Sequence, residues 1–283
     1  MRTFRMASKV CQHNLRKLIC SPRFTLGIVV LLCLQAFQVL PELRRFCTDR
    51  GVGAAPIPLY LNLTNERFPV TVCYFCWILW MCDAPFIDSL QPYLMLRAGR
   101  QRWTWGNLFY ILVSAVLFWT CVWGVCIVAM GGKIDWTMDW GPVYRYIVSV
   151  EHLSSLKVSD VLIQKFSPIQ LLGLSFGLKV MCSVFLAELM YLVNFLTRNH
   201  YGMIAAAILL LFHGHFYDWF AGSDLYYVSP ISLSTLNCID IVEMGMRPSV
   251  AYAVGALLSL CILCTALCFW VVQGRAIQVY KSI

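Results

Sequence analysis

The feature that most constrains this chain is a series of apolar runs, several of them 18 residues or longer. A helix rises about 1.5 Å per residue and needs roughly 20 apolar residues to cross a hydrocarbon layer about 30 Å thick. Charged residues make up only 13% of the 283 positions, about half of the ~25% typical of soluble domains. The sequence therefore predicts an all-α polytopic membrane protein, with residues 1–283 forming a single transmembrane domain.

Six transmembrane spans are predicted, at about residues 24–41, 68–87, 106–130, 168–196, 201–220 and 250–272. Residues 1–23 contain six Lys or Arg and no acid, which predicts a basic amphipathic helix on the inner membrane surface. The first apolar run begins late and is long, so we interpret it as a retained span and not as a signal peptide.

The distribution of basic residues predicts the orientation of the spans. Lys and Arg concentrate in the N-terminal arm, in residues 97–102, at Arg198 and in the C-terminal tail. The positive-inside rule places these segments, and both termini, in the cytoplasm. The basic residues lie at the ends of apolar runs and form no continuous face, so nucleic acid is not an expected partner.

Two outer connections differ from ordinary loops. Residues 131–167 alternate charged and aromatic residues, which predicts a helix resting on the outer surface. Residues 221–248 are too apolar for a solvated loop, yet Ser229-Pro230 and Asp240 divide them into pieces too short to span. This pattern predicts outer re-entrant or interfacial helices between spans five and six, with their broken backbone buried by the protein.

The inner connection at residues 87–102 is the segment with the clearest functional signal. Asp88 can cap a short helix, Pro92 falls in its first turn, and Gly99 can end it in a left-handed conformation, which predicts about two turns of helix. A basic loop that answers only to the positive-inside rule is the alternative. Apolar side chains in a cytoplasmic connection favour a docking surface instead. The candidate docking residues are Leu90, Pro92, Tyr93, Leu94, Arg97, Gly99, Arg100 and Arg102.

These segments together resemble a known family. Residues 96–103 (Leu-Arg-Ala-Gly-Arg-Gln-Arg-Trp), which run into Trp105-Gly-Asn-Leu, look like the coupling helix of permease subunits of ATP-binding-cassette exporters of the second type. Residues 227–235, followed by Arg247-Pro-Ser-Val-Ala-Tyr252, are similar to that family's outer re-entrant pair. The residues of this outer pair that carry the resemblance are Ser229, Pro230, Ser232 and Ser234.

The resemblance covers the whole chain and implies a transport subunit in a bacterial cell membrane, of the kind that exports peptides, antibiotics or lipid-like molecules. It implies a second, identical or related, permease chain and separate ATPase subunits that bind ATP and Mg²⁺. The chain itself has no Gly-x-x-x-x-Gly-Lys-Ser/Thr phosphate-binding loop, so we expect it to bind no cofactor and to have no enzyme activity.

Lys179 and Glu188 are the ionisable residues deepest within a predicted span. Such charges are costly in a membrane, so they either line a transport path or have a structural role. A path through them would suit an ion-driven secondary transporter. They are nine positions apart on a helix and therefore on opposite faces, so we do not expect them to pair.

An intramembrane enzyme is a further alternative. Its candidate residues are Ser175, His213, His215 and Asp218. The two histidines and the aspartate also offer metal-ligand types, but three plausible ligands alone do not predict a metal site. Cys47 and Cys238 are the cysteines predicted outside the membrane, and a disulfide between them stays open.

Overall fold

The computed structural model describes residues 2–85, 91–146, 160–219, 225–242 and 247–274. Within these residues the regular elements are helical, and the only β-structure is two isolated bridges. Four of the described helices are long and apolar enough to cross a membrane: α2 with its continuation η1 (Pro22–Leu34 and Gln35–Val39), α7 (Arg100–Ala129), α10 (Pro168–Thr197) and α14 (Val250–Gly274). These helices indicate a multi-pass membrane protein.

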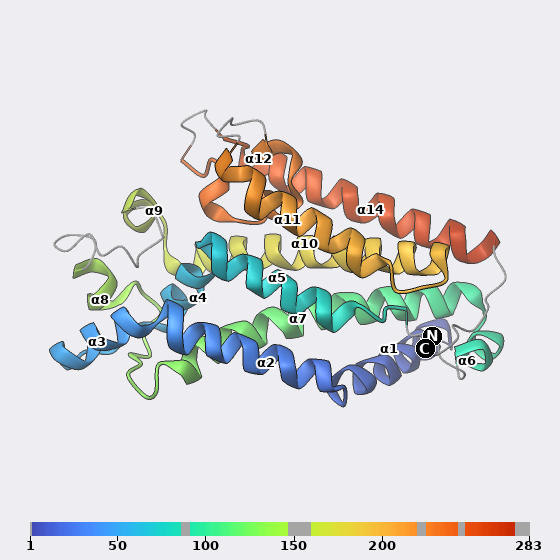
Figure 1. The fold of residues 1–283 in the computed structure, drawn as a ribbon, viewed down its shortest axis with the longest axis horizontal. Helices are drawn as coiled ribbons and strands as arrows, with labels where there is room; N and C mark the ends of the chain where they lie inside the picture. The colour runs from blue at the N-terminus through green and yellow to red at the C-terminus, as the bar shows by residue number, and fades with distance from the viewer. Residues whose placement is uncertain (1, 86–90, 147–159, 220–224, 243–246, 275–283) are drawn as a thin grey trace.

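The two remaining predicted spans form shorter helices. Residues 68–87 were predicted as one span, but α5 (Arg67–Met81) ends six residues earlier and is about 22 Å long. Residues 201–220 correspond to α11 (Gly202–Trp219), and the part of it whose side chains are described, Gly202–His213, is an apolar helix. Both helices lie along the direction of the long helices (Figure 1).

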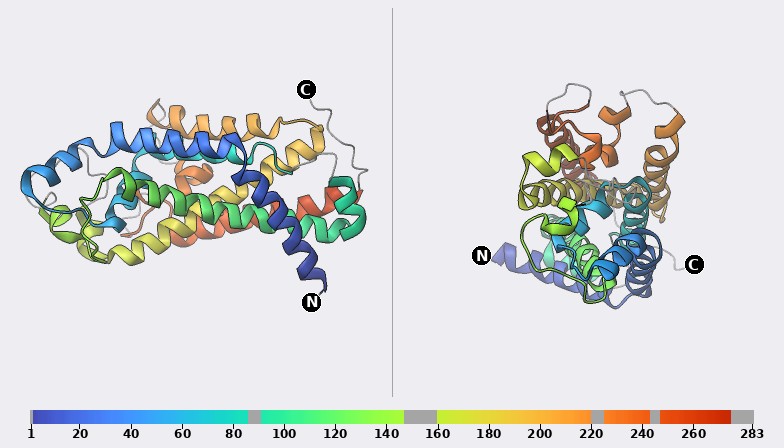
Figure 2. Two further views of the ribbon diagram at one scale, coloured as in Figure 1. Left: turned by 90° about the horizontal axis from the view of Figure 1, so that it is seen from below. Right: turned by 90° about the vertical axis from the view of Figure 1, so that its left-hand side faces the viewer.

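The long helices pack side by side around α10, which contacts α7, α11 and α14 (Figures 1 and 2). Large aromatic side chains fill the space between α5, α7 and α10. Trp77 and Trp119 are fully buried, and their indole N–H groups donate to the backbone oxygen (2.9 Å) and the hydroxyl (2.8 Å) of Ser183. Because each buried N–H has an acceptor, the rings add apolar contact without an unsatisfied donor.

The predicted N-terminal amphipathic helix is α1 (Arg2–Ile19). It ends before residue 23, because Ser21 caps the next helix and Pro22 begins it. Figure 2 shows α1 crossing the bundle obliquely. Its buried face packs on α7, where Asn14 Nδ2 donates to Asn107 Oδ1 at 2.7 Å, so α1 is attached to the helical bundle.

The end of the bundle that the positive-inside rule predicts to face outward, which we call the outer end, contains a helix that the sequence analysis missed. After α3 (Pro41–Arg50), α4 (Pro56–Asn65) enters the bundle between α5, α7 and α10, and all ten of its residues are buried. Trp123 Nε1 donates to the Pro56 oxygen at 2.8 Å, and the Asn65 side chain accepts from the Leu236 N–H at 3.0 Å. α4 is therefore a core element and not an outer loop.

The other outer elements are short. Residues 131–167 contain α8 (Gly141–Tyr146) and α9 (Asp160–Lys165), as the prediction of a helix there required, although residues 147–159 lie outside the described part. Residues 221–248 contain α12 (Leu225–Val228), α13 (Pro230–Leu233) and the 3₁₀ helix η3 (Leu236–Cys238). At the opposite end of the bundle, which the positive-inside rule predicts to face the cytoplasm and which we call the inner end, α6 (Gln91–Ala98) connects to α7.

Candidate functional site

The candidate docking helix α6 exposes apolar side chains at the end of the bundle where α7 begins. Tyr93 is 72% exposed and Leu96 84% exposed, whereas Met95 and Ala98 are buried against the protein. Leu94 is half-buried between these two faces. The helix is thus held by one face and presents the other, which contains an aromatic and an aliphatic side chain, outward.

The boundaries of α6 agree with the predicted two turns. Gly99 has a φ of +84°, a value that glycine adopts readily, and its N–H donates to the Met95 oxygen at 2.7 Å. Its ψ of 148° lies outside the left-handed helical region that the sequence predicted. Pro92 lies in the first turn as expected, but its side chain, Leu90 and Asp88 lie outside the described residues.

The basic residues after α6 belong to a different element from the one predicted. Helix α7 begins at Arg100, so Arg100 and Arg102 are in its first turn and not in a connection that ends at residue 102. Arg100 Nη1 donates to the Gln273 backbone oxygen at 2.8 Å and so closes the end of α14. Arg97 is the exposed cation on α6 itself. The guanidinium at Arg100 is therefore a link between helices as well as a topology signal.

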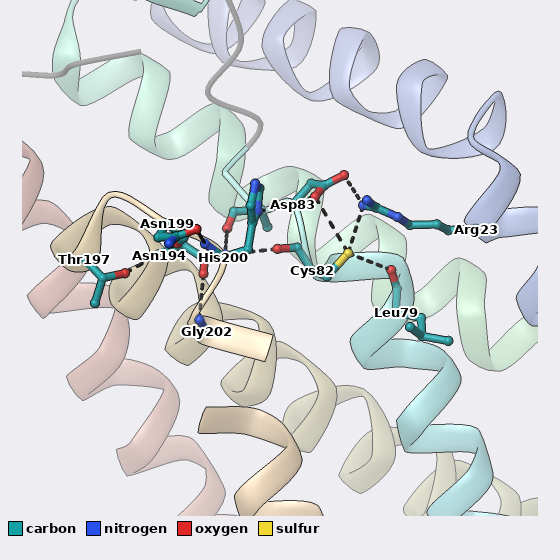
Figure 3. Close-up of polar contacts among 10 residues, drawn as sticks. Arg23, Leu79, Cys82, Asp83, Asn194, Thr197, Asn199, His200 and Gly202 are labelled. Atoms are coloured by element: carbon teal, nitrogen blue, oxygen red, sulfur yellow. Dashed lines mark hydrogen bonds and ion pairs between the residues drawn. The ribbon is translucent and has the colours of Figure 1, made fainter. Parts of the chain in front are cut away.

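A set of hydrogen bonds, which we call the inner polar cluster, ties the chain just before α6 to three helices (Figure 3). It consists of Arg23, Leu79, Cys82, Asp83, Ala84, Asn194, Thr197, Asn199, His200 and Gly202. The Asn194 amide is its centre: Nδ2 donates to the backbone oxygens of Cys82 (3.1 Å) and Ala84 (2.8 Å), and Oδ1 accepts from the Gly202 N–H (2.7 Å). One side chain of α10 thereby fixes the end of α5 and the start of α11.

Charged contacts complete the inner polar cluster. Arg23, at the start of α2, forms an ion pair with Asp83, and the same carboxylate lies 3.5 Å from His200 Nδ1 (Figure 3). Both contacts are partly exposed, so each contributes little to stability by itself. Their position matters more, because they connect the start of α2 and the link between α10 and α11 to Asp83, which precedes α6 in the chain.

Lys179 is enclosed in the centre of the bundle, with 0% exposure. Its Nζ donates to Thr235 Oγ1 at 3.1 Å and lies over the rings of Tyr74 and Trp119, 5.6 and 5.8 Å from their centroids. Among the described residues no carboxylate forms an ion pair with it. Its contacts hold the segment after α13 against α10, an arrangement that suits a structural role better than an open transport path.

Glu188 lies on the other side of α10 and does not contact Lys179, as its helical spacing predicted. Thr265 on α14 donates to its Oε1 at 2.7 Å. Its Oε2 is buried without a hydrogen-bond partner among the described residues. A buried carboxyl oxygen without a partner is costly, so Glu188 remains a candidate functional group within the membrane.

The serines of the predicted re-entrant segment have separate partners. Ser229 caps α13, where its Oγ accepts from the Ser232 N–H at 3.4 Å. The Ser232 hydroxyl lies 3.0 Å from His213 Nδ1 on α11, and the Ser234 hydroxyl lies 2.7 Å from the Tyr74 hydroxyl. Pro230 begins α13 and is buried. These contacts satisfy the polar groups of a segment that is itself buried.

Of the candidate enzyme residues, Ser175 and His213 have described side chains, and the two contact different groups. That serine is fully buried, and its hydroxyl lies 3.5 Å from Thr64 Oγ1. His213 pairs with Ser232, a contact that sequence spacing could not show, and the side chains of His215 and Asp218 lie outside the described part. In that part no three potential metal ligands gather.

Cys47 and Cys238 are both free thiols, so the disulfide considered from the sequence is not formed. Burial raises the pKa of the Cys238 thiol to about 11. Burial also raises the pKa of the Cys47 thiol, with a smaller opposing effect of Lys133. Both are therefore neutral thiols at pH 7.

Comparisons with protein-family models, curated proteins and solved structures found no match. The functional interpretation therefore rests on the residues and contacts described above.

Proposed function

We propose that this chain is the membrane-spanning permease subunit of an ATP-binding-cassette exporter, and that α6 binds the separate ATPase. The observation that carries the proposal is the exposure of Tyr93 and Leu96 on a short helix at the basic end of the bundle. Exposing two large apolar side chains to water is unfavourable unless a partner covers them.

The chemistry of α6 defines the surface that it would bind. Tyr93 and Leu96 suit an apolar groove, and tyrosine is among the residues that contribute most to interface energies. The exposed Arg97 next to them favours acidic residues at the rim of that groove. ATP and Mg²⁺ would be bound by the partner, and this chain would supply no catalytic group.

The inner polar cluster offers a route from α6 into the spans. Gly99 joins α6 directly to α7, and Asn194 ties the chain before α6 to α10 and α11. A displacement of α6 by nucleotide-driven closure of the ATPase would therefore reach several spans at once. Tilting of these spans would move a peptide, an antibiotic or a lipid-like substrate outward.

The proposal includes six spans, with α5 and α11 as the two short ones, and both termini in the cytoplasm of a bacterial cell. The support is that α5 and α11 extend along the bundle between its two ends (Figure 1). The contact of Arg100 with Gln273 puts the end of α14 beside the start of α7, which directly follows α6. α12, α13 and η3 would form the outer re-entrant segment, and a second permease copy or a related chain would complete the pathway.

Purification of the tagged full-length chain from its native membranes tests the proposal. We expect a chain with an ATP-binding phosphate loop to co-purify, and ATP hydrolysis to accompany it. Tyr93→Ala and Leu96→Ala should each weaken this association by about 2 kcal/mol, roughly 30-fold.

Trp136→Ala is the matched control, because Trp136 is 75% exposed but lies in an outer connection. It should leave the association unchanged. Retention of the ATPase by the Tyr93→Ala, Leu96→Ala double variant at the level of this control would overturn the proposal.

An ion-driven secondary transporter is the second candidate, and the unpartnered Oε2 of Glu188 is the observation that favours it. A protonatable carboxyl within the membrane can couple a gradient to transport. Transport that persists after ATP depletion, collapses with the ion gradient and is lost in Glu188→Gln would select this function over the first.

A further inference from the structure

A pocket of about 260 Å³ lies between the outer half of α11 and the segment that links α12 to α13. One face of α11 forms one wall, with Leu209, Phe212 and His213 at helical spacing. Val228 and Pro230 form the opposite wall, and Ser229 and Ser232 lie beside them. The pocket is therefore mostly apolar, with its polar groups gathered on a few side chains.

The polar groups that line the pocket belong to His213, Ser229 and Ser232. The imidazole of His213 is only 4% exposed, and its Nδ1 lies 3.0 Å from the fully buried Ser232 hydroxyl. Ser229 Oγ accepts the Ser232 N–H at 3.4 Å, and Ser229 also lines the pocket. A hydroxyl can both donate and accept, so these serines can bind a further hydroxyl or carbonyl group.

The mouth of the pocket opens on an apolar face of the molecule. Phe212 and Val228 at its rim are 52% and 76% exposed, and Ile208 and Leu211 beside them on α11 are also exposed. In a membrane protein such a face is covered by lipid. A ligand would therefore enter from the bilayer and not from water.

We infer that this pocket binds the uncharged, hydroxyl-bearing end of an amphiphile, with the glycerol end of a diacylglycerol as the simplest example. None of the described residues that line it is Lys, Arg, Asp or Glu, so a charged head group would lose its hydration without gaining a counter-ion. An apolar chain alone would make no use of the hydroxyl groups of Ser229 and Ser232.

The volume limits how much of the ligand can enter. About 260 Å³ is close to the lower end of ligand pockets, which begin at roughly 300 Å³, and it holds on the order of ten non-hydrogen atoms. The head and the first part of a chain would be enclosed, while the remaining chain would stay in the bilayer. This inference does not depend on an ATPase, because binding concerns the isolated chain.

Photolabelling of the full-length chain in phospholipid nanodiscs tests the inference. The probe is a diacylglycerol with a diazirine in its acyl chain, and the labelled sites are mapped by mass spectrometry. We expect saturable labelling of residues 208–213 and 226–232, competed by unlabelled diacylglycerol. Leu209→Trp, which fills the pocket, should reduce this labelling at least five-fold, and Ser232→Ala should reduce it about five-fold, as the loss of one hydrogen bond predicts.

Ile204→Trp is the matched control, because Ile204 is exposed on the same helix one to two turns from the pocket. It should leave labelling within two-fold of wild type. A phosphatidylglycerol probe with the same diazirine chain distinguishes a bilayer phospholipid from an uncharged ligand. Equal labelling by that charged probe, labelling that does not saturate, or an unchanged Leu209→Trp result would each overturn the inference.

Discussion

At the scale of single residues, Asn194 has the most consequential contacts at the inner end. Its amide joins three chain segments that are far apart in sequence, through two donated hydrogen bonds and one accepted hydrogen bond. All three partners are backbone groups. Loss of this side chain would leave buried backbone groups unsatisfied.

Asn194→Leu should therefore lower the free energy of unfolding by about 2 to 4 kcal/mol. Thermal unfolding of the purified chain in detergent measures the change. Asn199→Ala is the control: the Asn199 side chain accepts from the exposed His200 N–H, within the same turn, and its loss should cost less than about 1 kcal/mol. Equal unfolding temperatures for Asn194→Leu and Asn199→Ala would contradict the role given to Asn194.

Lys179 is a second residue whose role can be tested through its neighbours. If its ammonium holds the outer segment through Thr235, then Lys179→Ala should loosen that segment and expose Cys238. In the wild type Cys238 is buried, and burial raises the pKa of its thiol to about 11, so the thiol is almost entirely protonated at pH 7. Exposure would lower that pKa toward its ordinary value and raise the reactive fraction.

The measurement is modification of Cys238 by a membrane-impermeant maleimide, followed by mass spectrometry. We expect modification to be at least ten-fold faster in Lys179→Ala than in wild type. Cys47 is also buried but lies far from this segment in sequence. It therefore reports on general unfolding and should stay unmodified. Unchanged Cys238 reactivity would show that Lys179 does not hold the segment.

At the scale of elements, the docking of α1 on α7 depends on one close approach. A Cβ atom at Gly106 would lie 2.7 Å from the Val10 Cβ and 3.0 Å from the Ala7 backbone oxygen. No side chain, however small, fits there without moving α1. Gly124, on the same helix, has no neighbour within 4 Å of such an atom.

Gly106→Ala should therefore separate α1 from α7 and destabilise the chain by about 1 to 3 kcal/mol. Gly124→Ala should be neutral, or stabilising by up to about 1 kcal/mol, because alanine favours the helix. Protease sensitivity of residues 2–19 together with thermal unfolding distinguishes the two variants. If the two variants had the same protease sensitivity and the same unfolding temperature, the close packing of α1 on α7 at Gly106 would be contradicted.

The elements also show which parts of the fold the sequence could predict. Long apolar runs identified α2, α7, α10 and α14, because membrane crossing depends on local composition and length. Pro92 and Gly99 predicted the two ends of α6, because each residue favours a particular backbone conformation at its own position. α4 was missed because its ten residues are too few to span, and its burial depends on α5, α7 and α10, which a sequence window cannot contain.

The inner polar cluster was missed for a similar reason. Asn194 and Cys82 are 112 residues apart, and an asparagine near the end of a span gives no local sign of its partner. The Ser232–His213 contact is closer in sequence, but it depends on how α13 folds back toward α11. Residue types indicated which groups could act, and only the packing showed which groups meet.

At the scale of the whole molecule, the two ends of the bundle differ in character. The inner end has an exposed apolar helix, α6, supported by hydrogen bonds that reach α2, α10 and α11. The outer end is closed by short buried elements, α4, α13 and η3, and Asn65 links α4 to η3. If α6 moves, the helices that hydrogen bonds tie to the chain before it, α2, α10 and α11, would therefore move with it. The motion would reach the outer end, where α4, α13 and η3 are buried.

Site-directed photo-crosslinking from Leu96 in intact cells tests the central claim most directly. A photoreactive amino acid at that position should crosslink to a chain with an ATP-binding phosphate loop, and the yield should change when ATP is depleted. The same amino acid at Met138, an exposed apolar residue of an outer connection, should give no such product. Crosslinks from Leu96 that contain only lipid, or none at all in a chain that is correctly inserted and stable, would contradict the assignment of α6 as the ATPase-binding helix.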